Sequence, residues 1–209
     1  MITLRRRLRR LVRPTALERR VASFELGPDD LAIDCGANVG DVTFELARTG
    51  AFVHAFEPNP DAFAVLSRRF EGRANVQVHE QAVLDRTGSV RLYLHVDAER
   101  DAVGASVGSS VLSFKGNVDS ERFVEVSSVD LAAFILALER PTSVLKIDVE
   151  GAECPVVHRL LDTGAIDRVG LTLIELHDRH IPELRAENDR LRDRLESEGL
   201  SGRVLTDWH

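Results

Sequence analysis

A glycine-containing turn stands out early in the chain, where Asp34-Cys-Gly-Ala-Asn-Val-Gly40 follows an apolar run and precedes an amphipathic stretch. Glycines let a backbone turn tightly and approach a ligand closely, and a helix that begins here presents free N–H groups. Dinucleotide sites need a second glycine where Asn38 stands. Asp34 disfavours a phosphate at this turn, so a ligand with a cationic amino group suits it better. We therefore assign four residues to ligand binding: Asp34, Gly36, Asn38 and Gly40.

An acidic residue, Glu57, ends the second apolar run, 21 residues after Gly36. A carboxylate about 20 residues after the glycine turn is placed to accept hydrogen bonds from both ribose hydroxyls of a nucleoside. Pro58 stiffens the turn that aims it. Further along, Gln81 offers both a donor and an acceptor, which suits an adenine edge, and Ala82 follows it. These four residues extend the predicted binding site: Glu57, Pro58, Gln81 and Ala82.

Ionisable residues also cluster after two later apolar runs. Asp148, Glu150 and Glu153 follow one run, and Glu175 and His177 end the next. Open α/β sheets bind ligands outside the carboxyl ends of their strands. We therefore expect part of these two clusters to lie at the same site as the glycine turn.

Short apolar runs alternate with amphipathic stretches along the chain, which predicts crossover connections and a mainly parallel sheet with helices on both faces. The expected core strands are residues 31–35, 52–56, 76–79, 144–149, 169–176 and 204–206. The expected helices are residues 41–48, 61–70, 131–138, 155–161 and 181–198. Period-two alternation in residues 90–96 and 123–127 predicts a small antiparallel insert. The fold class is therefore α/β.

Composition fits one soluble α/β domain of 209 residues with 44% hydrophobic and 29% charged residues. The chain has no stretch near the roughly 20 apolar residues that a membrane span requires. Two cysteines make neither a disulfide framework nor a zinc quartet. No apolar run of signal-peptide type follows the N-terminal arginines, so we expect a cytoplasmic protein.

The net charge of the chain is −7, but it is unevenly distributed along the sequence. Residues 1–20 hold eight arginines and one glutamate, which leaves the remainder at −14. We expect a basic extension over residues 1–22, able to make weak contact with an anionic surface, and a domain over residues 23–209. Within the domain, residues 97–121 are rich in glycine and serine, and we expect a lid or insert there.

Taken together, the motifs resemble the FkbM family of S-adenosylmethionine-dependent methyltransferases over about residues 30–180. The matching pieces are Ile33-Asp-Cys-Gly-Ala-Asn-Val-Gly40, Ala55-Phe-Glu-Pro-Asn-Pro60, Gln81-Ala-Val83, Ser128-Val-Asp130, Leu145-Lys-Ile-Asp-Val-Glu-Gly-Ala-Glu153 and Ile174-Glu-Leu-His177. The resemblance implies a Rossmann-like class I fold, S-adenosyl-L-methionine as cofactor, and usually O-methylation of a sugar or natural-product hydroxyl. The chain departs from the family at Cys35, where a small residue or Val is common. It also has one candidate strand after the last helix, where this fold normally has a hairpin.

Methylation of a hydroxyl needs in-line positioning and removal of a proton. We expect Asp148 to face the methyl or amino end of the cofactor, and His177 or Glu150 to act as the base. A divalent metal is an alternative, with Asp148 or Glu150 and Glu175 or His177 as ligands. We favour direct base catalysis, because no tight ligand spacing in the sequence compels a metal.

Three other functions compete with methylation of a small-molecule hydroxyl acceptor. An RNA methyltransferase would use the basic N-terminus to hold phosphate, although the acidic body of the chain argues against a nucleic-acid partner. A non-catalytic module would bind the cofactor without transferring its methyl group. An NAD-dependent oxidoreductase is the least favoured, because the second glycine is missing.

Overall fold

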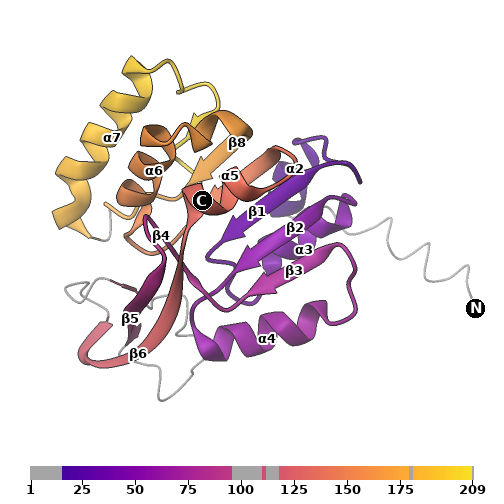
Figure 1. Cartoon of the computed structure of the whole chain (residues 1–209), viewed down its shortest axis with the longest axis horizontal. Helices are drawn as coiled ribbons and strands as arrows, with labels where there is room; N and C mark the ends of the chain where they lie inside the picture. Colours follow the sequence, from indigo (N-terminus) through magenta and orange to yellow (C-terminus); the bar gives the residue numbers. More distant parts are fainter. Residues whose placement is uncertain (1–15, 96–109, 112–117, 179–180, 209) are drawn as a thin grey trace, which may run out of the picture.

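The computed structural model describes residues 16–95, 110–111, 118–178 and 181–208, which form a central sheet with helices on both faces (Figure 1). Six strands of this sheet lie in the order β3-β2-β1-β7-β8-β9, and every pairing between neighbours is parallel. The bounds are β1 Leu31–Cys35, β2 Phe52–Phe56, β3 Val76–His79, β7 Thr142–Ile147, β8 Val169–Ile174 and β9 Val204–Leu205. The predicted α/β fold class is confirmed.

The described α-helices have seven or more residues; α2 precedes β1, and the others lie between strands. Their bounds are α2 Ala16–Ala22, α3 Asp41–Arg48, α4 Pro60–Phe70, α5 Leu131–Ala137, α6 Glu153–Asp162 and α7 Arg185–Ser197. Two short 3₁₀ helices, η2 Ala165–Arg168 and η3 Pro182–Leu184, precede β8 and α7. Helix α4 begins where the Asn59 side chain accepts hydrogen bonds from two backbone N–H groups, and Pro60 takes the first helical position. Asp130 caps α5, where its side chain accepts the N–H of Ala133.

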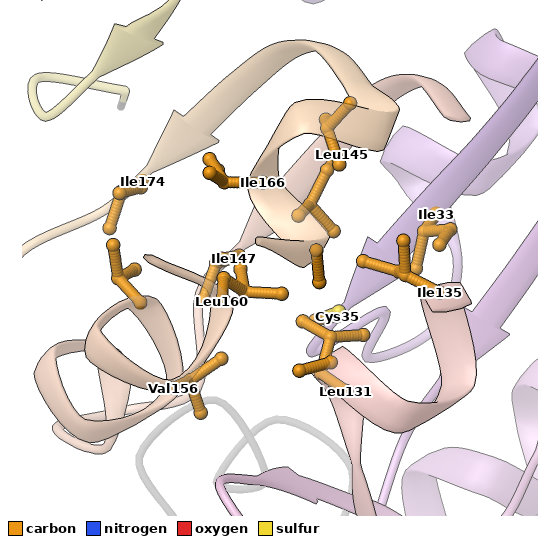
Figure 2. Packing of buried hydrophobic residues seen from close by; sticks show 14 of the residues in the cluster. Ile33, Cys35, Leu131, Ile135, Leu145, Ile147, Val156, Leu160, Ile166 and Ile174 are labelled. Atoms are coloured by element: carbon orange, nitrogen blue, oxygen red, sulfur yellow. The ribbon is translucent and has the colours of Figure 1, made fainter. Parts of the chain in front are cut away.

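Strand β1 is buried at all five positions because helices cover both of its faces. Ile33 and Cys35 pack with residues of α5, α6 and α7, a cluster that Figure 2 shows from close by. Ala32 points to the opposite face, where it packs with residues of α2 and α3. Burial on both sides fixes the strand whose carboxyl end leads into the glycine turn.

A second sheet of three strands has the order β4-β6-β5, with bounds β4 Ala82–Leu84, β5 Gly88–His95 and β6 Val118–Asp130. The β5–β6 pair is antiparallel, which confirms the predicted insert. Strand β4 pairs in parallel with β6 and was missed, because three residues are too few to show a period. Residues 118–121 of the predicted lid belong to β6, and Ser110 and Val111 are also described; residues 97–109 and 112–117 lie outside the described residues.

The two ends of the described chain meet on one face of the sheet. Strand β9 pairs with β8 in parallel and is the edge strand among the described residues, at the edge where this fold normally has a hairpin. Trp208 is 6% exposed and lies under the Arg20 guanidinium, 4.1 Å from the ring centroid. Val21 is buried too, so residues 16–22 of the predicted basic extension pack on the domain. Residues 1–15 lie outside the described residues. Among the described helices, none combines the length and the apolarity that crossing a bilayer demands.

Candidate active site

A cavity of about 320 Å³ opens at the carboxyl ends of β1, β2 and β7. The chain order reverses between β1 and β7, and open α/β sheets bind ligands at such a switch point. Eight of the predicted site residues line the cavity: Gly36, Asn38, Glu57, Pro58, Gln81, Ala82, Asp148 and Glu150. The structure thus brings residues from four separate motifs to one place.

The glycine turn lies against the end of β7. A Cβ atom built on Gly36 would stand 1.8 Å from the backbone oxygen of Asp148, and Gly36 has a φ of +76°. Only glycine fits a position with this close approach and this backbone conformation. The N–H groups of Gly36 and Ala37 both donate to Phe56 O, which joins the turn to the end of β2.

Glu57 faces this turn from the end of β2, as the sequence predicts. Its Oε2 accepts the N–H of Asn38 at 2.8 Å, and its Oε1 accepts the N–H of Asn59 at 2.8 Å. Burial raises the pKa of Glu57 to about 7, against the lowering effect of these two hydrogen bonds and of Lys146. Two lone pairs of the carboxylate remain for a ligand in the cavity.

Lys146 joins the two sides of the cavity, a role that the sequence reasoning missed. Its Nζ lies 3.3 Å from Asp34 Oδ1 and 3.1 Å from Asp148 Oδ2, and it donates to Gly36 O at 2.8 Å. Burial lowers the pKa of Lys146, but the charges of Asp34 and Asp148 outweigh it and raise the pKa overall. The signal in the sequence was a lysine inside an otherwise apolar strand, because such a residue needs an acidic partner.

Asp34 and Gly40 do not line the cavity, contrary to their assignment as contact residues. Asp34 is 0% exposed, and its Oδ2 accepts the hydroxyl of Thr43 at 2.6 Å. Gly40 precedes α3 with a φ of +89°, and a Cβ there would stand 2.5 Å from the Phe70 ring and 2.7 Å from Leu66. Both residues therefore shape the turn from beneath it.

Asp148, Glu150 and His177 meet at the other end of the cavity. His177 Nε2 lies 3.6 Å from Asp148 Oδ1 and 3.4 Å from Glu150 Oε2, and His177 Nδ1 lies 3.1 Å from Glu153 Oε1. Burial lowers the pKa of His177, but Glu153, Glu150 and Asp148 raise it to about 9. The imidazole stands behind the two carboxylates rather than on the cavity wall, and this pKa favours Glu150 over His177 as a proton acceptor at neutral pH.

Glu150 is held in a left-handed backbone conformation, with a φ of +58°. Such a conformation costs about 1–2 kcal/mol outside glycine and persists where the surroundings hold it. Ser110 Oγ donates to Glu150 O at 2.6 Å, and Glu153 accepts the N–H groups of Val149 and Gly151. Ser110 comes from the predicted lid, so this segment contributes directly to the site.

Comparison with known proteins agrees with this arrangement. The family described as "Methyltransferase FkbM domain" matches residues 34–200, which include every motif lining the cavity. The chain belongs to the FkbM methyltransferase family. Its six-stranded sheet, with the glycine turn after β1 and the acidic residue after β2, is the Rossmann-like class I methyltransferase fold.

Two curated relatives of this FkbM-family chain match over most of its length. It is 31% identical to 31-O-demethyl-FK506 methyltransferase FkbM of Streptomyces tacrolimicus over 74% of the chain and 68% of that protein. It is 27% identical to hexuronic acid methyltransferase AglP of Haloferax volcanii over 73% of the chain and 58% of that protein. Among solved structures, an rRNA methylase from Streptococcus thermophilus matches with a TM-score of 0.48 and 12% identity, over 88% of this chain and 80% of that chain.

Other curated relatives match over a short segment only. Ribosomal RNA small subunit methyltransferases A align over 62 to 71 residues, and the chain spans only 22% to 26% of their length.

Proposed function

We propose that this protein is an S-adenosylmethionine-dependent O-methyltransferase that acts on a hydroxyl of a sugar or of a small natural-product-like molecule. One observation carries the proposal. Glu57 is fixed by two backbone N–H groups beside the glycine turn, in the same cavity as the carboxylates of Asp148 and Glu150. A nucleoside site and a pair of carboxylates able to handle a proton therefore share one space.

The residues of the cavity fit S-adenosylmethionine part by part. Glu57 retains lone pairs for the two ribose hydroxyls, and Gln81 offers a donor and an acceptor for the adenine edge. An apolar wall suits the faces of the adenine ring and consists of Ala82, Val83, Leu84, Leu92 and Val111. Asp148 stands beside the turn, where its carboxylate suits the cationic end of the cofactor.

When bound, S-adenosylmethionine supplies a methyl group on a positively charged sulfur. The chain must hold the acceptor oxygen in line with that methyl group, and such positioning contributes about 7–11 kcal/mol. In that transfer the acceptor oxygen would bond to the methyl carbon as the carbon–sulfur bond breaks, and sulfur would keep the electron pair. The hydroxyl proton goes to the Glu150 carboxylate, which lines the cavity.

The names of two relatives support a small-molecule acceptor. The names 31-O-demethyl-FK506 methyltransferase and hexuronic acid methyltransferase both describe oxygen-rich small molecules. An RNA acceptor is the second candidate, because residues 1–20 hold eight arginines and short segments match ribosomal RNA methyltransferases. The net −14 on the rest of the chain repels RNA, so the small molecule is our first choice.

The test is a transfer assay with methyl-labelled S-adenosylmethionine. The purified protein is incubated with a panel of polyketide alcohols, neutral sugars and uronic acids, and separately with RNA. Label in a base-stable ether of a small molecule supports the proposal. Label in a base-labile ester would show that the acceptor group is a carboxylate and not a hydroxyl. Label in RNA alone contradicts the small-molecule proposal. The matched control is Glu57→Ala, which must lose transfer in every arm.

A further inference from the structure

Three potential metal ligands converge at the acidic end of the cavity. One oxygen each of Asp148 and Glu150 and one ring nitrogen of His177 all lie within 4.8 Å of one another. Asp148 and Glu150 follow β7, and His177 follows the neighbouring strand β8. The two carboxylates line the cavity, so a cation held here touches the space proposed for the acceptor.

The imidazole of His177 points into this group while almost completely buried. Its side chain is 7% exposed, and the nearest oxygens to Nε2 stand 3.4 Å and 3.6 Å away. Charge-assisted hydrogen bonds between nitrogen and carboxylate are shorter, about 2.7–2.9 Å. Two ligands bound at about 2.1 Å to one cation stand roughly 3.0–3.4 Å apart, so the observed spacing suits a shared ion better than a direct bond.

A second layer of contacts orients two of the three ligands, His177 and Asp148. Glu153 is 2% exposed, faces His177 Nδ1 and is itself fixed by the N–H groups of Val149 and Gly151. A carboxylate behind the second ring nitrogen is the usual support of a metal-binding histidine. On the other side, Lys146 Nζ forms an ion pair with Asp148 Oδ2, so the other carboxylate oxygen, Oδ1, faces His177. His177 and Asp148 are therefore each pre-oriented by a partner outside the cluster.

We propose that Asp148, Glu150 and His177 bind a divalent transition-metal cation such as Mn²⁺. The two carboxylates suit Mn²⁺, and the imidazole favours a transition-metal ion over Mg²⁺, which prefers oxygen ligands. The inference rests on the proposed function, because the role of the ion is to bind the acceptor hydroxyl and lower its pKa. The hydroxyl proton then passes to the second oxygen of the Glu150 carboxylate, and the cation keeps the alkoxide beside the methyl group until the transfer.

The experiment titrates the chelator-treated full chain with Mn²⁺ and follows the free ion by electron paramagnetic resonance. We expect one ion per wild-type chain, and affinities at least about tenfold weaker in His177→Ala and Glu150→Gln. Glu153→Gln should weaken binding by about 10- to 100-fold through the orientation of His177. His158→Ala is the matched control, because His158 lies on α6 and contacts Arg194. Thermal unfolding and circular dichroism establish that each variant is folded.

A parallel titration with S-adenosylhomocysteine separates this inference from the proposed function. His177→Ala should bind the nucleoside within about threefold of wild type, because His177 does not line the cavity. Equal Mn²⁺ binding by wild type and His177→Ala, or no binding at millimolar Mn²⁺, overturns the metal site. Methyl transfer that a chelator leaves unchanged overturns its catalytic role. Mn²⁺ binding without nucleoside binding supports the metal site and contradicts the proposed function instead.

Discussion

The two ends of the cavity are built in different ways. At the end proposed to hold the nucleoside, which we call the nucleoside end, the glycine turn and Glu57 are held by backbone hydrogen bonds between neighbouring strands and turns. At the acidic end, Asp148, Glu150 and His177 come from two strand ends, and Ser110 reaches them from the β5–β6 insert. The first end is fixed by the local fold. The second end depends on side chains and on the β5–β6 insert, which suits the proposal of a cofactor site built by the fold beside an acceptor site built by side chains.

The largest effect is expected at the acidic end, from Glu150→Gln. The amide cannot take the hydroxyl proton, so the rate of methyl transfer should fall by about 10²–10⁴-fold. Steady-state kinetics at saturating cofactor measure this rate. Glu198→Gln is the control, because Glu198 forms its ion pair with Arg194 and not with a residue of the cavity. A loss below threefold would remove Glu150 from the chemistry.

Lys146→Met tests the link between the two ends. The substitution leaves Asp34, which is 0% exposed, without its cation, so the free energy of unfolding should drop by about 3–5 kcal/mol. The double variant with Asp34→Asn should recover part of this loss, because it removes the unpaired charge. Urea denaturation gives both values. Additive losses in the double variant contradict the ion pair.

Gly36→Ala tests the close approach between the turn and β7. Gly72 has a similar φ of +73° but nothing within 4 Å of a built Cβ, so Gly72→Ala carries the backbone strain alone. We expect Gly36→Ala to lower the free energy of unfolding by at least about 2 kcal/mol more than Gly72→Ala, because the turn must also move away from Asp148 O. Chemical denaturation measures the difference, and equal effects would show that the contact carries no strain.

The smallest effect concerns the protonation of Glu57, whose pKa burial raises to about 7. The ribose hydroxyls donate to the carboxylate, so binding requires the deprotonated form. The affinity for S-adenosylhomocysteine should therefore rise about tenfold between pH 6 and pH 8 and change little in Glu57→Gln. Calorimetry across this pH range measures the affinity of both proteins. If wild type and variant show the same pH profile, the titrating group is not Glu57.

Much of the nucleoside end was predictable because its signals are local. Strands β1, β2 and β3 and helix α3 begin and end where the sequence indicates, and the glycine turn lies beside Glu57 as expected. Asp34 and Gly40, which we expected to contact the ligand, lie outside the cavity lining, because a motif names the residues of a turn without saying which side each one faces.

The acidic end was harder to predict because it depends on tertiary contacts. The sequence left Glu175 and His177 as alternative metal ligands, and the strand packing places His177 with Asp148 and Glu150. The roles of Lys146 and Ser110 follow from contacts between residues that lie 110 and 40 positions apart in the sequence. Strand β4 and the parallel edge strand β9 are two or three residues long, so their pairing comes from the surrounding sheet.

Calorimetric titration of S-adenosylhomocysteine into wild type and Glu57→Ala tests the central claim most directly. We predict one site per chain in the wild type and an affinity at least about 100-fold weaker in the variant, since a hydrogen bond to a charged group contributes about 1.5–3 kcal/mol and two are lost. Absence of binding to the wild type at millimolar nucleoside, or equal affinity in both proteins, would contradict the account.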